Sequence, residues 1–242
     1  MAAPNSLILK TQDGIAIHGR HWSRANRAVF LIMPGYAQHS GSGVMQSIAE
    51  DLAVTRDVLC LDPRGNGRSD GRFQFGANEW RDVEAALRWA SEHYDDVSLL
   101  GFSLGAYSSL RTCVEGAVKP DRLFLVSCPT KFQDIVFKGH ALHHGFKALA
   151  HPLLLKKERY PFFRWGNPLR SKPSASDLAC RLEVPVSFLV GAEDKLVPPS
   201  MSRAVYDQVA GEKKWLELAR ADHAEFIFES HPVECGLWVD AF

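Results

Sequence analysis

The sequence predicts a single α/β domain, with a mostly parallel central sheet flanked by helices. Its 242 residues, of which 46% are hydrophobic, suit one large core and leave little room for a second domain. Short runs rich in β-branched and aromatic residues alternate along the chain with stretches of helical periodicity, as in strands joined by crossover helices. No repeat with a period of about 20 to 50 residues is visible, which excludes solenoids and propellers.

The first expected elements are two strands joined by a tight turn. Residues 7–10 and 15–22 flank Asp13-Gly14, a dipeptide typical of hairpin turns. Apolar runs predict six further strands, at residues 28–33, 57–62, 97–102, 123–127, 184–190 and 215–218. Helical periodicity predicts helices over residues 44–54, 80–92 and 104–114. The helices therefore alternate with the strands.

The alternation stops between Thr130 and Lys172, where aromatic, histidine and basic residues cluster. We expect residues 130–180 of the single domain 1–242 to form a helical cap, or lid, inserted between two strands. Nine lysines and arginines against two acids give residues 130–172 a net charge of +7, so the rest of this neutral chain carries −7. The interleaved apolar side chains are suited to lining an apolar pocket, although a solvated basic face over an ordinary packed interior is the plainer interpretation.

The charge of the whole chain is balanced, with 28 basic and 28 acidic residues. Such a chain has no general attraction to nucleic acid or to an anionic membrane, so charge effects must be local. No apolar run approaches the roughly 20 residues of a transmembrane segment, and the N-terminus lacks the pattern of a signal peptide. The five cysteines lack metal-ligand spacing and are interpreted as free thiols in a reducing compartment. We expect a cytoplasmic protein that does not bind nucleic acid.

A GxSxG pentapeptide, Gly101-Phe102-Ser103-Leu104-Gly105, stands between an expected strand and an expected helix. A serine on such a strained strand-to-helix turn projects its hydroxyl above the carboxyl end of the sheet. There the N-terminus of the helix favours developing negative charge. This context favours Ser103 as a nucleophile over an incidental serine in a glycine-bounded turn.

With this pentapeptide, the sequence resembles the α/β-hydrolase superfamily over nearly the whole chain apart from the cap, and the resemblance implies an α/β-hydrolase fold. Members of the superfamily place a catalytic acid after a late strand and a histidine after the last strand. Residues 191–198, GAEDKLVP, resemble the family's Gly-x-x-Asp-x-x-Val-Pro loop and imply Asp194 as the acid, with Glu193 as the fallback. Ala221-Asp222-His223 follows the last expected strand and implies His223 as the base.

In the mechanism that this resemblance implies, His223 takes the proton of Ser103 as the serine attacks a carbonyl, while Asp194 orients the imidazole. The resulting oxyanion needs two backbone N–H donors, and the residue after the nucleophile, Leu104, supplies one. The other comes from the loop after an earlier strand, where Pro34-Gly35 replaces the His-Gly pair of similar hydrolases. We assign this second donor to Tyr36.

Residues 62–71, DPRGNGRSDG, resemble a segment common in the same superfamily, and we interpret them as structural, with Asp62 and Arg64 bonded to local backbone. The segment is not GxGxxG, and no Walker-type motif occurs elsewhere, which disfavours nucleotide binding. His140, His144 and His151 share a helical spacing, but nearby glycines weaken the helix that the spacing presumes. We expect neither a cofactor nor a metal.

The function expected from these residues is hydrolysis of a carboxylic ester or thioester through an acyl-enzyme on Ser103. The basic cap suits a small acyl ester or thioester on an anionic carrier, such as coenzyme A or an acyl carrier protein. Acyl transfer or peptidase chemistry would use the same triad, although residues 34–41 lack the His-Gly-Gly-Pro-Gly pattern of proline-releasing peptidases. A catalytically inactive, hydrolase-like binding protein is the alternative from another class. Acyl chain length, leaving group and oligomeric state stay open.

Overall fold

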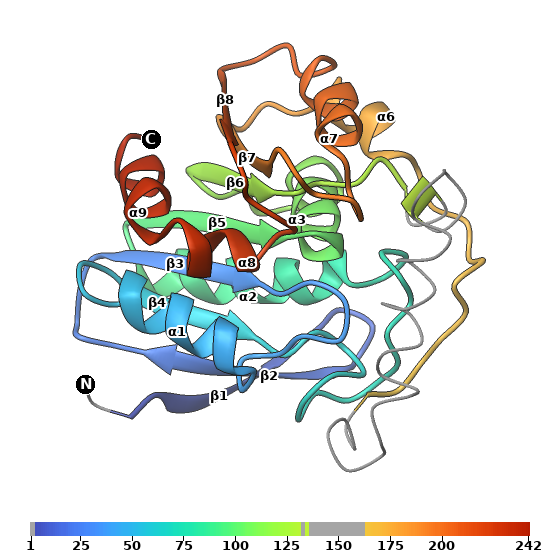
Figure 1. The fold of residues 1–242 in the computed structure, drawn as a ribbon. Helices are drawn as coiled ribbons and strands as arrows, with labels where there is room; N and C mark the ends of the chain where they lie inside the picture. The colour runs from blue at the N-terminus through green and yellow to red at the C-terminus, as the bar shows by residue number, and fades with distance from the viewer. Residues whose placement is uncertain (1–2, 132–133, 136–162) are drawn as a thin grey trace.

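The computed structural model describes residues 3–131, 134–135 and 163–242, which fold around one eight-stranded sheet (Figure 1). The strand order is β1-β2-β4-β3-β5-β6-β7-β8. β1 pairs antiparallel with β2, and β2 antiparallel with β4, whereas every other neighbouring pair is parallel. The strands are β1 (Asn5–Lys10), β2 (Ala16–Trp22), β3 (Ala28–Met33), β4 (Asp57–Leu61), β5 (Asp96–Phe102), β6 (Arg122–Val126), β7 (Val186–Gly191) and β8 (Lys213–Leu218). The predicted α/β class with a mostly parallel sheet is confirmed.

Helices cover both faces of this sheet. One layer consists of α2 (Trp80–His93), α3 (Leu104–Glu115), α6 (Ala175–Ala179) and α7 (Pro199–Tyr206). The other consists of α1 (Gly43–Leu52), α8 (Phe226–Ser230) and α9 (Pro232–Asp240). Figure 1 shows α8 and α9 beside α1, although they come from opposite ends of the chain.

The core lies in two layers because the central strands are buried on both faces. Along β3, Leu31 packs into the cluster shared with α2 and α3, whereas Phe30 and Ile32 pack into the cluster shared with α1 and α9. Side chains alternate between faces along a strand, so a strand covered on both sides becomes a continuous apolar run. This is why the apolar runs of the sequence predict the positions of the strands.

The hairpin expected at Asp13-Gly14 is present. The N–H of Thr11 donates to the carbonyl of Ile15 at 3.0 Å, and Gly14 adopts a φ of 81°. A residue with a side chain rarely adopts this left-handed conformation, so glycine fits the turn.

Most of the expected cap, including His140, His144 and His151, lies outside the described residues. At its end, α6 begins with a capping box in which the Ser174 hydroxyl accepts from Asp177 N at 3.1 Å. Leu178 on this helix packs into the core cluster beside α3. Within the described ranges, no helix has the length and apolar character needed to cross a membrane.

Candidate active site

Ser103 occupies a strained turn between β5 and α3. Its φ of 52° and ψ of −118° lie in a region that residues other than glycine rarely adopt. Its backbone N–H donates to the carbonyl of Val126 at 2.9 Å, which ties the turn to the end of β6. The carboxyl end of β5 and the first turn of α3 therefore meet at this serine, as expected for a nucleophile on a strand-to-helix turn.

Two glycines allow the backbone around Ser103 to pack closely. A Cβ atom on Gly105 would overlap the carbonyl oxygens of Met33 and Pro34, so only glycine lets α3 approach the end of β3. A Cβ atom on Gly35 would lie 3.3 Å from the Cβ of Ser103. The loop that follows β3 is thus packed directly against the serine.

Asp194 and His223 lie on the loops after β7 and β8 and are in direct contact. His223 Nδ1 lies 2.7 Å from Asp194 Oδ2, and the other carboxylate oxygen accepts from the backbone N–H groups of Leu196 and Val197 at 2.9 and 2.8 Å. Asp194 is buried, whereas the fallback residue Glu193 is exposed. Because Nδ1 faces a carboxylate, it carries the ring proton in the neutral imidazole, and Nε2 is the acceptor.

The surroundings of His223 favour its protonated form. Burial lowers the pKa of His223, but the Asp194 carboxylate, with smaller contributions from Glu225 and Asp222, raises it more. The pKa of His223 is therefore above its ordinary value. A base with this environment holds a proton well once it has taken it from a nucleophile.

The loop that carries His223 reaches across the sheet towards Ser103. The N–H of Ala224 donates to Ser127 Oγ at 3.0 Å, and Ser127 directly follows β6. β6 pairs with β5 through Phe102 and Val126, immediately before Ser103. The structure thus brings the loops of Ser103, Asp194 and His223 to the same carboxyl edge of the sheet.

The two residues assigned to the oxyanion hole flank the same turn. Leu104 is the first residue of α3, so its N–H has no acceptor within the helix. Tyr36 follows Gly35 and lies partly buried, with its ring 5.2 Å from that of Phe163 and 5.8 Å from those of Phe73 and Phe75. Burial raises the pKa of the Tyr36 phenol.

An apolar cluster lies beside this edge of the sheet. It joins the residue after Ser103 to the residues after Asp194, and its members are Phe73, Phe75, Leu104, Ile135 and Val197, with Tyr36, Phe163, Trp165, Leu196 and Met201 packed against them. Phe73 and Phe75 were not among the site residues expected from the sequence. The signal that could have pointed to them is the pair of aromatic residues on either side of Gln74, just beyond the glycine-rich segment 62–71.

The segment 62–71 forms two separate polar networks. Asp62 accepts from the backbone N–H of Arg68 at 2.8 Å, the local bond that was expected, and also from that of Ser40 in the loop after β3, at 2.8 Å. Arg64 instead pairs with two carboxylates, Asp13 at 2.8 Å and Asp82 at 2.7 Å. The Asp82 side chain is fully buried, and burial raises its pKa to about 7 although Arg64 opposes the shift.

Comparisons with known proteins agree with this architecture. An esterase from Pyrococcus furiosus is 18% identical, with a TM-score of 0.77, and the alignment covers 99% of this chain and 92% of that chain. A hydrolase from Pseudomonas aeruginosa PA01 is 18% identical, with a TM-score of 0.72 and coverage of 98% of this chain and 97% of that chain. An esterase from Rhodococcus sp. ECU1013 is also 18% identical, with a TM-score of 0.70 and 98% coverage of each chain.

Identities this low show a shared fold, and the family follows from a different comparison. A model of the alpha/beta hydrolase family matches residues 15–235, which is most of the chain. The expected superfamily and its fold are thereby confirmed. The chain belongs to the alpha/beta hydrolase family.

Proposed function

We propose that the protein is a serine hydrolase that cleaves carboxylic ester or thioester bonds through an acyl-enzyme on Ser103. The observation that carries this proposal is the 2.7 Å contact between His223 and Asp194, made at the edge of the sheet where Ser103 sits on a strained turn. A nucleophile, a base and a group that orients the base are the three parts that acyl transfer requires.

In the first half of the reaction, Ser103 Oγ attacks the carbonyl carbon of the substrate as His223 Nε2 takes the hydroxyl proton. The carbonyl electron pair moves to oxygen, and the N–H groups of Leu104 and Tyr36 stabilise the resulting oxyanion. Collapse of this intermediate breaks the bond to the leaving alcohol or thiol, which receives the proton from His223. In the second half, water repeats these steps on the acyl-enzyme and releases the acid.

The side chains near the serine support the proposed substrate class. The apolar cluster around Phe73 and Phe75 favours an acyl group with hydrocarbon character. The esterases among the structural relatives support ester chemistry on this fold. Residues 130–180 are proposed as the cap over this site, and their basic residues suit an acyl group on an anionic carrier.

The test is intact-mass analysis after treatment with a fluorophosphonate, which phosphonylates an activated serine. One adduct on the native protein is expected, with none on Ser103→Ala and far slower labelling of His223→Ala. Ser91→Ala, which removes an exposed hydroxyl on α2, is the matched control and keeps the adduct. No adduct on well-folded native protein would favour a hydrolase-like binding protein without catalytic activity.

Substrate assays then separate the activities that share this chemistry. Hydrolysis of 4-nitrophenyl acyl esters and acyl thioesters, with loss in Ser103→Ala, is the expected result. Cleavage of peptide arylamides alone would instead identify a peptidase. Product analysis with an added alcohol would identify an acyltransferase if the new ester outweighs the free acid.

A further inference from the structure

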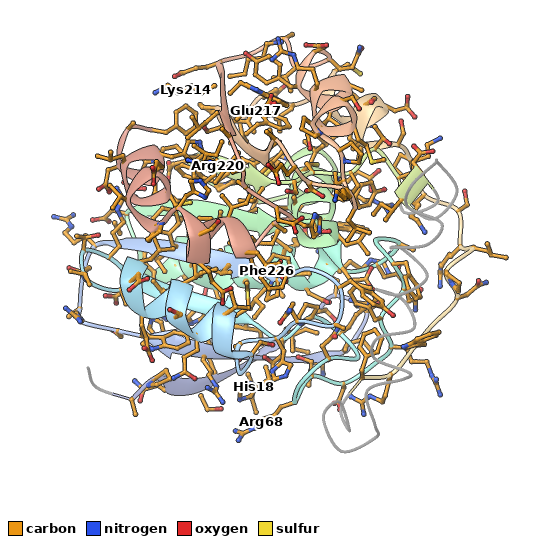
Figure 2. All side chains as sticks on the ribbon, viewed as in Figure 1. His18, Arg68, Lys214, Glu217, Arg220 and Phe226 are labelled. Atoms are coloured by element: carbon orange, nitrogen blue, oxygen red, sulfur yellow. The ribbon has the colours of Figure 1, made fainter. Side chains whose placement is uncertain are left out.

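A cavity of about 310 Å³, lined by charged, imidazole and glycine residues, lies at the carboxyl end of β4, between β2 and the loop before α1. Its walls include His18 and Arg20 from β2, His39 and Gly41 from the loop, and Asp62 and Arg68 after β4. Figure 2 shows His18 and Arg68 close together, beside the start of α1. The volume is at the lower end of the roughly 300–1,000 Å³ that is typical of ligand sites.

Two guanidinium groups line this cavity without a carboxylate partner in the described part of the chain. Arg68 is exposed and forms no ion pair there, and Arg20 bonds only to the Gln46 amide oxygen, at 3.3 Å. A Cβ atom on Gly41 would lie 3.1 Å from Arg20 Nη2 and 3.0 Å from His39 Cε1. The Arg20 guanidinium and the His39 ring therefore both lie against Gly41, in the space that a side chain at this position would occupy.

His39 supplies a further donor to the cavity, and His18 forms part of its wall. His39 Nδ1 accepts from Gly41 N at 3.1 Å, so in the neutral ring Nε2 carries the proton. Burial lowers the pKa of His39, which keeps the ring neutral. His18 is 6% exposed, its Nε2 lies 2.7 Å from Ser6 Oγ, and its buried Nδ1 has no hydrogen-bond partner.

The acidic residue in the cavity wall, Asp62, already has donors of its own. Its Oδ1 accepts from Ser40 N at 2.8 Å and from Ser40 Oγ at 2.6 Å, and its Oδ2 accepts from Arg68 N at 2.8 Å. His18 Nδ1 lies 3.4 Å from the same Oδ2. The backbone of Gly67 covers this carboxylate so closely that a Cβ atom there would overlap it. The charge of Asp62 is thus satisfied locally, and the two guanidinium groups leave the wall positive.

We infer that this cavity binds a phosphate group, as inorganic phosphate or as a phosphate monoester. Two guanidinium groups and one imidazole N–H can donate to several terminal oxygens of a phosphate and balance its double negative charge. A carboxylate needs only one guanidinium group to satisfy both of its oxygens. α1 adds the positive end of a helix, because it begins at Gly43 with no capping side chain and no acid in its first turn.

The cavity lies near Ser103, and this proximity holds whether or not the proposed hydrolysis takes place. β4 and β5 are separated only by β3, so the end of β4, which forms the near wall of the cavity, lies roughly 10 Å across the sheet from the serine turn. The loop between β3 and α1 contributes to both places, since Gly35 packs against Ser103 while His39 and Gly41 line the cavity.

The test is isothermal titration calorimetry with inorganic phosphate, glycerol phosphate and acetate at constant ionic strength. Native protein is expected to bind either phosphate at one saturable site, at least tenfold more tightly than acetate. The double variant Arg20→Gln/Arg68→Gln should weaken phosphate binding at least tenfold. Arg203→Gln, which removes an exposed arginine on α7 near the opposite end of the sheet, should leave it unchanged.

A second variant keeps both arginines. Gly41→Ala places a methyl group between Arg20 and His39, which must both shift slightly, and should weaken phosphate binding less than the double variant does, with an unchanged circular dichroism spectrum. Absence of saturable phosphate binding, equal affinity in the double variant, or acetate bound as tightly as phosphate would each overturn the inference. Because the titration involves no turnover, none of these results depends on whether Ser103 is catalytic.

Discussion

The Nδ1 atom of His223 lies 2.7 Å from Oδ2 of Asp194, although 29 positions separate the two residues in the chain. Neighbouring parallel strands, β7 and β8, carry the loops that place them together. The second oxygen of Asp194 is held by two backbone N–H groups, so the carboxylate cannot easily rotate away from the imidazole. The carboxylate of Asp194 is therefore held in contact with the imidazole of His223.

We expect Asp194→Asn to lower ester hydrolysis and fluorophosphonate labelling about 10⁴-fold, the magnitude found when an orienting carboxylate is replaced by its amide. The amide can donate to Nδ1 and so favours the wrong imidazole tautomer. Labelling kinetics by mass spectrometry, with kcat/KM, measure the effect. Glu193→Gln is the matched control. Comparable losses in the two variants would show that Asp194 does not act as the orienting acid.

The raised pKa of His223 predicts the pH dependence of the rate. The imidazole acts as a base only when neutral, so kcat/KM should rise with pH and reach half its maximum above pH 6.5, the ordinary value for histidine. Without the Asp194 carboxylate, the residual activity of Asp194→Asn should have its midpoint at lower pH. The measurement is kcat/KM between about pH 5 and 8. An unshifted midpoint in the variant would contradict this account.

The strands and helices were predictable from the sequence wherever burial produces a regular pattern of apolar residues. β3 has the predicted bounds because both of its faces are buried and its whole length is apolar. The sequence does not reveal α9 in the same way, because Val233 and Leu237 are exposed and obscure the spacing of Cys235, Trp238 and Val239, which are buried. Local patterns do not show which apolar residues will be covered.

The order of motifs along the chain predicts Ser103, Asp194 and His223, but not the contacts that arrange their loops. Ser127 and Ala224 both have positive φ values, of 49° and 48°, and bond to each other across 97 positions. Neither residue type signals such a conformation, since packing between β6 and the loop after β8 imposes it. Phe73 and Phe75 lie near Tyr36 through contacts between distant parts of the chain, which the local pattern around them does not show.

The buried pair Arg64–Asp82 should be essential for stability. Arg64→Met would leave the fully buried Asp82 without its cation, and breaking a buried pair in this way typically costs about 3–5 kcal/mol. Urea denaturation measures the loss. The control is Arg203→Met, because Arg203 pairs with Asp207 on the surface, where such pairs contribute about 0–1 kcal/mol. Similar losses in the two variants would exclude a special role for burial.

Gly105 tests whether the close approach of α3 to β3 determines both stability and reactivity. A methyl group at this position meets the carbonyl oxygens of Met33 and Pro34, which are backbone atoms and can yield only if the end of β3 moves. We expect Gly105→Ala to cost about 1–3 kcal/mol in the free energy of unfolding, as overpacking commonly does.

The same shift would displace the N–H of Leu104 from the oxyanion, so fluorophosphonate labelling of Ser103 should also slow in Gly105→Ala. Gly43→Ala is the matched control, because a Cβ atom there has nothing within 4 Å and alanine suits the start of α1. Its stability should be unchanged or slightly higher, with labelling at the native rate. If Gly105→Ala labels at the native rate despite its lower stability, the position of the helix does not control the reactivity of Ser103, and the assignment of Leu104 to the oxyanion hole is wrong.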